Sequence, residues 1–372
     1  MVIDLTRELV RFDTCNPPGN ERACAEILGA RLEAGGFSVE RYQYADRRTS
    51  LVARIGGNGD RPPLCFTGHL DVVPTGAAPW KRDPFAGEVD GDQIHGRGTS
   101  DMKCGVAALV VAALGSAKRL ARSPGLTLVL TAGEETGCDG ASDLARRGVL
   151  GHAGAIVVGE PTSNAPFVGH RGCLRFRCIT SGVTAHSSMP ELGDNAIYKA
   201  ARAISALERF DFAGFDHPVM GRPTLVVSQV HGGMNINSVP DRAEFGVDVR
   251  TVPGQDLARL RARLHDALGN DVSIEPIVEI PSVFSDADDD WIQSVFARAR
   301  EIVGVEPATR TAPYFTDASV LRPAYGGPPT VILGPGEAAM AHQTDEYCKA
   351  SRLTEAVTLY ERLIDDWVLA SR

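Results

Sequence analysis

The sequence predicts an α/β fold in which a mostly parallel sheet with helices on both faces is interrupted by an inserted, ferredoxin-like α+β domain. Three observations support this prediction. The chain has 372 residues, which suits two domains, since one domain usually takes ~100–200 residues. Apolar strands and helices alternate towards both ends of the chain. The middle of the chain follows a different order of elements.

Continuous apolar runs separated by helical stretches make up the first part of the chain. Such runs are typical of strands that are buried on both faces, as parallel strands are. A helix is predicted at Glu21–Ala34 and ends at a pair of glycines, a common C-terminal signal. A long apolar helix is predicted at Met102–Leu120. The predicted strands are Leu51–Ile55, Leu64–Thr67, Leu126–Thr131 and Ala155–Val158.

The middle of the chain has the order strand, helix, strand, strand, helix, strand, which is the split ferredoxin-like arrangement. The predicted elements are Cys173–Thr180, Asn195–Phe210, Thr224–Val230, Ala243–Arg250, Asp256–Leu268 and Val272–Ile280. After Pro281 the alternation resumes, with elements at Asp289–Val303, Thr330–Leu333 and Arg352–Leu369. We therefore predict one domain from residues 1–171 and 281–372, and an inserted domain from residues 172–280.

Composition excludes several classes of partner. The formal net charge is −9, and no run of Lys or Arg forms a local basic patch, so nucleic acid is not an expected partner. No stretch has the ~18–20 uninterrupted apolar residues of a membrane span. The first residues include Asp4 and Glu8 where a secretory signal needs an apolar core. The eight cysteines form no CxxC pair and are expected to be reduced. We predict a cytoplasmic protein.

A histidine and an aspartate follow one of the predicted strands. His69 and Asp71 stand in Thr-Gly-His-Leu-Asp-Val-Val-Pro, and residues two apart on an extended segment project to the same side. Asp71 is therefore expected to accept the second imidazole N–H of a metal-binding His69, which orients the ring. The same pair is also compatible with a strand end that binds no metal.

Five further residues supply carboxylates or imidazole at strand ends or in adjoining loops, where α/β sheets place their ligands. Asp101 lies in a glycine-rich loop before the long helix, where it could also be the N-cap. Glu134 and Glu135 follow an apolar strand; a metal hydrolase needs one acid as ligand and another as general base, although a solvated acidic turn has the same sequence. Glu160 ends a buried strand, and His342 lies about 270 residues after His69. Two histidines and three carboxylates, one of them bridging, suit a pair of Zn²⁺ ions.

Taken together, these motifs resemble the M20 metallopeptidase and amidohydrolase family along nearly the whole chain. The Gly-His-Leu-Asp, Gly-Arg-Gly-Thr-Ser-Asp-Met-Lys, Gly-Glu-Pro-Thr and Ala-His-Gln-Thr-Asp-Glu segments carry the resemblance and look most like its acetylornithine deacetylase and succinyl-diaminopimelate desuccinylase branch. The resemblance implies that His69 and Glu160 hold one zinc ion, that Glu135 and His342 hold the other, and that Asp101 bridges them. It also implies that Glu134 is the general base and Asp71 the orienting residue.

The resemblance assigns the inserted domain as a lid and dimerisation domain. It implies that His186 stabilises the oxyanion, and that Asn237, Arg250 and Thr316 contact substrate. His186 could instead be an ordinary loop histidine, and Arg250 could form a structural ion pair. The chain departs from the family pattern at Cys104, where a glycine is common, and at Tyr314-Phe315, which precede Thr316-Asp317. Aromatic bulk there is expected to reshape the substrate pocket.

The sequence thus predicts a dinuclear zinc hydrolase that cleaves the amide of an N-acyl amino acid, with Glu134 as the base for a metal-activated water. Co²⁺ or Mn²⁺ could replace zinc, because geometry and availability decide metal identity as much as affinity does. A dipeptidase, carboxypeptidase or aminoacylase is the alternative enzyme, and a binding protein on the same fold is a remote one. The family resemblance also implies a homodimer through the inserted domain.

Overall fold

The structure is a computed structural model, and it describes residues 1–57 and 61–369. Two compact units emerge from it. The first contains residues 1–169, 284–312 and 316–372, and the second contains residues 170–283 and 313–315. The second unit is slightly longer at both ends than the predicted insertion. It also includes the short segment Pro313–Phe315, which the sequence placed in the other domain.

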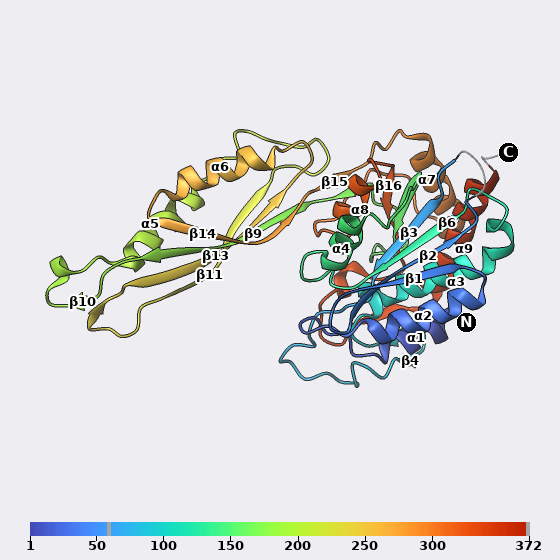
Figure 1. Cartoon of the computed structure of the whole chain (residues 1–372), viewed down its shortest axis with the longest axis horizontal. Coiled ribbons are helices and arrows are strands. Elements are labelled where there is room, and N and C mark those ends of the chain that lie inside the picture. Colours follow the sequence, from blue (N-terminus) through green and yellow to red (C-terminus); the bar gives the residue numbers. More distant parts are fainter. Residues whose placement is uncertain (58–60, 370–372) are drawn as a thin grey trace. The chain divides into compact units, whose positions relative to one another are not determined.

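A six-stranded sheet forms the centre of the first unit, with the strand order β1-β2-β6-β3-β7-β16 (Figure 1). From β6 to β16 neighbouring strands are parallel, whereas β1 and β2 are antiparallel to their neighbours. The prediction of a mostly parallel sheet is therefore confirmed. The strands are Ser38–Ala45 (β1), Arg48–Ile55 (β2), Leu64–His69 (β3), Leu126–Thr131 (β6), Ala155–Val158 (β7) and Thr330–Ile332 (β16).

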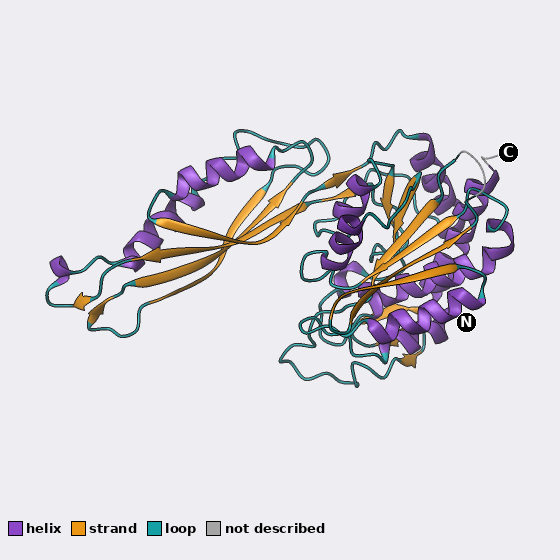
Figure 2. Ribbon diagram, viewed as in Figure 1, coloured by secondary structure: helices purple, strands orange, loops and turns teal. Residues whose placement is uncertain are grey.

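Helices cover both sides of this sheet (Figure 2). On one side α3 packs against α1 and α9, and α7 packs against α9; on the other side α4 packs against α8. The helices of the first unit are Val2–Val10 (α1), Arg22–Ala34 (α2), Cys104–Leu120 (α3), Asp139–Arg147 (α4), Asp290–Val303 (α7), Ala318–Ala324 (α8) and Ala350–Leu369 (α9). The segment Thr99–Leu120 is apolar and long enough to cross a membrane, but 72% of its most apolar window is buried, as in a core helix.

A smaller three-stranded sheet lies beside the main one in the same unit. Its strands are Glu88–Asp90 (β4), Gln93–His95 (β5) and Tyr347–Lys349 (β17), all antiparallel. Because Tyr347 pairs with His95, the chain just before β17 lies next to the chain just after β5. A short helical turn at Thr99–Lys103 then leads into α3.

The second unit has the predicted βαββαβ order, which confirms the ferredoxin-like arrangement. Its antiparallel sheet has the strand order β11-β13-β9-β14. Helices α5 and α6 contact each other, and their apolar side chains form one core with those of the sheet. The elements are Gly172–Ser181 (β9), Ala196–Glu208 (α5), Thr224–Gly232 (β11), Arg242–Thr251 (β13), Leu257–Leu268 (α6) and Val272–Ile280 (β14). Two short strands, Ala185–His186 (β10) and Ser238–Val239 (β12), pair with each other.

Side-chain caps explain where three of the predicted helices begin. Asn195, Asp256 and Asp289 each precede a helix and accept hydrogen bonds from amides of its first turn. Such caps satisfy donors that would otherwise lack partners at the helix start. The remaining short strands are Gly169–His170 (β8) and Val283–Phe284 (β15), at which the chain passes between the two units.

Candidate metal centre

The predicted ligand residues follow neighbouring parallel strands of the main sheet. His69 ends β3, Glu135 lies in the loop after β6, and Glu160 lies in the loop after β7. The carboxyl ends of parallel strands meet at one edge of a sheet, where ligands usually bind. His342 comes ten residues after β16 and has a left-handed backbone with a φ of 63°, a conformation that non-glycine residues adopt rarely and often at functional sites.

Five of these side chains form two groups that share one carboxylate. Asp101, His69 and Glu160 make the first group, and Asp101, Glu135 and His342 make the second; in each, one potential ligand atom per residue lies within 4.8 Å of the others. Both groups lie in the first unit. This grouping has the same composition as the two sites that the family resemblance implies.

Interatomic distances within the groups suit a pair of metal ions. His69 Nε2 lies 3.2 Å from Asp101 Oδ1 and 3.6 Å from Glu160 Oε1. His342 Nε2 lies 3.4 Å from Asp101 Oδ2 and 3.1 Å from Glu135 Oε2. Charge-assisted N–H···O bonds are usually shorter, about 2.7–2.9 Å. Ligand atoms about 2.0–2.1 Å from a tetrahedral Zn²⁺ lie roughly 3.3 Å from one another. The donor set therefore fits two cations with Asp101 between them.

The electrostatics of the cluster also favour cations. Burial raises the pKa of Glu134 and of Glu160 well above the ordinary carboxyl range, and neighbouring carboxylates raise it further. Burial opposes ionisation of Asp101 too, but hydrogen bonds from His342 and His69 outweigh it and hold its pKa below the usual value. Several buried acids so close together are costly unless positive charge compensates them, which two divalent ions would do.

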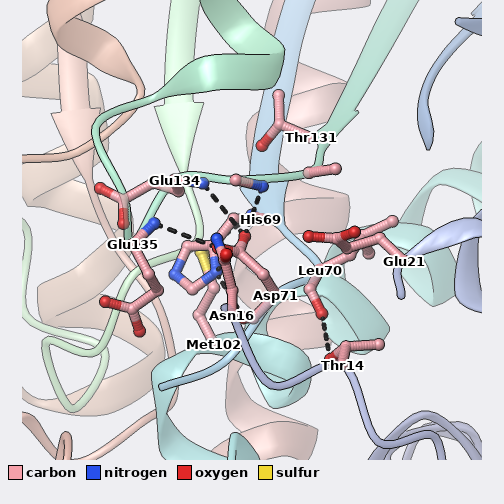
Figure 3. A network of polar contacts seen from close by, with 12 residues as sticks. Thr14, Asn16, Glu21, His69, Leu70, Asp71, Met102, Thr131, Glu134 and Glu135 are labelled. Carbon is pink, nitrogen blue, oxygen red and sulfur yellow. Dashed lines mark hydrogen bonds and ion pairs between the residues drawn. The ribbon is translucent and has the colours of Figure 1, made fainter. Parts of the chain in front are cut away.

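Asp71 holds the loop that carries the two glutamates (Figure 3). Its Oδ1 accepts the amides of Gly133 and Glu134 at 2.9 and 3.1 Å, and its Oδ2 accepts the amide of Glu135 at 3.2 Å. The sequence predicted that this carboxylate would accept the second N–H of His69. The partner of His69 Nδ1 is instead the Asp71 main-chain oxygen at 2.9 Å, and the nearest carboxylate oxygen is 3.6 Å away. The main-chain carbonyl orients the imidazole, because the carboxylate is engaged by the loop amides.

Glu134 differs from Glu135 in its surroundings. Figure 3 shows the two carboxylates lying apart. The Glu135 carboxylate contacts His342, whereas Glu134 is 5% exposed and its Oε1 has no hydrogen-bond partner among the described residues. A buried acid without a partner and with a raised pKa is a candidate proton carrier. The geometry is compatible with the predicted division between a ligand and a base.

A close backbone contact brings the start of α3, directly after the Asp101 loop, to the end of β7. A Cβ on Gly105 would lie 1.9 Å from the carbonyl oxygen of Gly159, so only glycine permits this approach. Asp101 has no helix-capping hydrogen bond, and its carboxylate instead contacts the two histidines; the N-cap interpretation is therefore wrong. Cys104 is buried, with Sγ 3.7 Å from the carbonyl oxygen of Ser100, so a thiol packs beside this loop.

Two polar residues near the centre were missed by the sequence interpretation. Asn16 donates to Asp71 Oδ2 at 2.8 Å and so helps to fix the carboxylate that holds the glutamate loop. Asp317 is buried, accepts the Thr131 hydroxyl, and has its pKa raised to about 6 by burial. Asn16 lies far from every motif, and no local signal identified it. Asp317 follows Thr316 in a segment that the family resemblance had singled out.

The predicted substrate contacts have different surroundings. His186 and Asn237 are exposed residues of the second unit, and His186 Nδ1 lies 2.7 Å from the Ser188 hydroxyl. Arg250, on β13, forms the ion pair that was the alternative interpretation: its Nε lies 2.7 Å from Asp248 Oδ1. Thr316 is fully buried in the first unit, where its hydroxyl accepts the amide of Ala318 at the start of α8.

Metal uptake is expected to release protons. In the metal-free protein, hydrogen bonds with Asp101 and Glu135 raise the pKa of His342 to about 10, so the ring is protonated at pH 7. Burial lowers the pKa of His69, but its bond to Asp101 and the nearby carboxylates outweigh that effect and raise it well above 6.5. A metal ligand must be the neutral imidazole. Metal affinity should therefore rise by about tenfold per pH unit for each proton released between pH 6 and pH 8.

Calorimetry of metal binding in buffers with different ionisation enthalpies measures this proton release directly. A binding enthalpy that is the same in every buffer would show that no proton leaves, and would contradict the metal-free protonation of the two histidines.

Comparison with known proteins shows the family of this chain. Residues 65–366 match Peptidase family M20/M25/M40. The chain is 30% identical to a probable succinyl-diaminopimelate desuccinylase from Staphylococcus epidermidis, over 96% of both chains. It is 32% identical to an acetylornithine deacetylase from Myxococcus xanthus, over 96% of this chain and 95% of that one.

Solved structures share the fold. An M20 family metallo-carboxypeptidase from Sulfolobus solfataricus superposes with a TM-score of 0.84 at 19% identity and covers 99% of both chains. A dinuclear metal-binding peptidase of the M20 family from Bacillus subtilis has a TM-score of 0.70 at 18% identity, over 99% of this chain and 98% of that one. Together with the sequence match, they place the chain among the hydrolases of peptidase family M20/M25/M40, to which it belongs.

Proposed function

We propose that the protein hydrolyses the amide bond of an N-acyl amino acid, with two Zn²⁺ ions held by His69, Asp101, Glu135, Glu160 and His342. The observation that carries this proposal is the pair of ligand groups that share Asp101. Their five side chains come from five separate segments, the end of β3 and four loops, and ordinary packing or surface charge does not account for such convergence of acids and imidazoles.

The chain's own residues supply the proton transfers. When bound, two divalent ions would polarise the amide carbonyl and bring the pKa of a water molecule close to neutrality. Glu134 would take a proton from the attacking water and return it to the leaving nitrogen. Asp71 would keep Glu134 and Glu135 in place, because its carboxylate accepts the amides of both. His69 would be held in one ring orientation by the main-chain oxygen of Asp71.

The substrate class rests on the names of the relatives. At 30–32% identity over almost the full length, the chain is similar to a probable succinyl-diaminopimelate desuccinylase and to an acetylornithine deacetylase. Both names describe removal of a small acyl group from the nitrogen of an amino acid. We propose the same reaction class here, with the acyl group and the amino acid to be identified by experiment.

A substrate panel tests this proposal. The zinc-loaded protein should be assayed with N-acetylornithine, N-succinyl-diaminopimelate, other acetylated and succinylated amino acids, and unblocked dipeptides. The expected result is a kcat/KM for at least one N-acyl amino acid that exceeds every dipeptide by tenfold or more. A preference for dipeptides would identify a peptidase of the same family, and the same chemistry would then serve a different substrate.

Residues of the second unit are proposed to act on the substrate. We retain His186 as the donor that stabilises the oxyanion, and Asn237 and Arg250 as contacts of the substrate carboxylate, on the strength of the family resemblance alone. Arg250 would have to exchange its partner Asp248 for the substrate, since the pair already forms a close contact. Thr316, which belongs to the first unit, is also retained as a proposed substrate contact; its hydroxyl is buried and already accepts the amide of Ala318.

We also propose a homodimer formed through the second unit. Strand β11 is an edge strand of its sheet, and its side chains Val226 and Val230 are 55% and 60% exposed. On the neighbouring helix α5, Tyr198 is 66% exposed. Exposed apolar edge strands commonly pair with another chain. Analytical ultracentrifugation should show a species of twice the 39.6 kDa chain mass.

A further inference from the structure

A buried arginine of the loop that carries Asp101 contacts three separate segments of the chain. Arg97 is 2% exposed. One terminal nitrogen donates to the carbonyl oxygen of Gln343 at 3.2 Å and to Glu346 Oε2 at 2.7 Å. The other donates to the carbonyl oxygen of Pro74 at 3.2 Å. Its guanidinium carbon lies 5.1 Å from the centre of the Trp80 ring, within the range of a cation–π contact.

The carboxylate of Glu346 is fully buried and accepts hydrogen bonds from main-chain amides of residues 98–101, the loop that carries Asp101. Oε2 accepts the amide of Gly98 at 2.8 Å, and Oε1 accepts those of Ser100 and Asp101 at 2.8 and 3.0 Å. With the contact from Arg97, four N–H groups surround this carboxylate. The amide of Asp101 belongs to the residue whose side chain joins the two ligand groups.

The contacts of this pair fall on the segments that deliver metal ligands. Gln343 follows His342 directly, the Glu346 contacts fix the loop of Asp101, and Pro74 lies five residues after His69. We propose that Arg97 and Glu346 form a positioning pair, which holds these three ligand-bearing segments in the geometry that binds metal. The inference rests on the proposed function, since it assigns the pair a role at that same centre.

Stability alone is a poor explanation for this pair. Removing a charged pair from water is costly, and apolar residues of similar size often stabilise a fold as well or better. An apolar pair, however, could not accept hydrogen bonds from three main-chain amides, nor donate hydrogen bonds to two carbonyl groups of different loops. Outer residues that orient metal ligands typically change metal affinity by 10–100-fold when they are replaced.

Glu346→Gln is the most direct test, because it keeps the size of the side chain and places an NH₂ group where the loop amides need an acceptor. Asp366→Asn is the matched control. Asp366 accepts a two-point contact from Arg298 at 2.8 and 2.9 Å, and this pair joins α7 to α9 in the same unit. Two readouts are needed: Co²⁺ affinity by titration of its visible absorption, and hydrogen exchange of the peptide spanning residues 96–103 in the metal-free protein.

The expected result is a loss of Co²⁺ affinity of 10–100-fold in Glu346→Gln, with faster exchange in residues 98–101. The Asp366→Asn control should keep its Co²⁺ affinity within twofold of the wild type, and its hydrogen exchange in that peptide should be unchanged. This should hold even if its melting temperature falls as much as that of Glu346→Gln. Wild-type affinity in Glu346→Gln, or an equal loss in the control, would overturn the inference.

Arg97→Lys keeps the test decisive if Glu346→Gln does not fold. Lysine preserves the charge beside Glu346 but cannot reach both carbonyl oxygens, so affinity should fall at least tenfold while the amides of residues 98–101 stay protected. Unchanged affinity in this variant would overturn the inference as well. Failure of the proposed function has a different signature: the wild-type protein would bind Co²⁺ but would not prefer any N-acyl amino acid of the substrate panel, and the affinity comparison would remain valid.

Discussion

Replacing Glu134 with glutamine is expected to lower kcat by about 10²–10⁴-fold, the range that a general acid–base group supplies. The substitution preserves shape but removes the group that carries protons. Both metal ions should remain bound, because Glu134 belongs to neither ligand group. Glu134→Ala should have the same effect on kcat. Steady-state kinetics on the best substrate of the panel, together with metal analysis of the same samples, measures both quantities.

A matched control for this variant is Glu301→Gln. Glu301 is an exposed glutamate of α7 that pairs with Arg298, and its replacement should leave kcat unchanged. If Glu134→Gln kept most of the wild-type kcat with both ions bound, Glu134 would not be the base. If it lost activity only because it lost metal, its role would be that of a ligand.

Replacing Asp101 with alanine is expected to abolish activity by weakening both metal sites at once. Asp101 is the only residue common to the two ligand groups found among the described residues. Its loss also leaves His69 and His342 without the carboxylate that lies 3.2 and 3.4 Å from their Nε2 atoms. We expect the affinity for both ions to fall by more than about 100-fold, beyond the effect usual for residues outside the ligand set.

The comparison variant is His342→Ala, which removes a ligand from one group only. Metal analysis after dialysis at a fixed free-metal concentration should then find close to one ion per chain, against two in the wild type and none in Asp101→Ala. Retention of one tightly bound ion by Asp101→Ala would show that this carboxylate serves a single site.

The sequence predicted the elements that carry continuous apolar runs, and these are the elements of the core. It missed β1, because that strand lies at the edge of the main sheet with mostly polar and exposed side chains. It also missed the short helices α4 and α8; α8 contains Pro323, which is unfavourable inside a helix. The grouping of Pro313–Phe315 with the second unit depends on tertiary contacts that no local pattern encodes.

The candidate ligands were predictable because their residue types are distinctive and their motifs occur at strand ends. The contacts that hold them were not. Asp71 was expected to face His69, yet its carboxylate accepts three loop amides. Glu346 lies in a motif that the sequence analysis recognised, but no role could be assigned to it there. The amides that it binds lie about 245 residues earlier in the chain, and a local motif does not reveal such distant partners. Side chains that bind main-chain amides leave no periodic signal in the sequence.

The most direct test of the central claim is a crystal structure of the zinc- or cobalt-loaded protein with anomalous scattering data. Two anomalous peaks about 3.5–4 Å apart are expected, with a carboxylate oxygen of Asp101 bound to each, and with His69 and Glu160 at one ion and Glu135 and His342 at the other. A single ion, or ions bound away from these five side chains, would contradict the account.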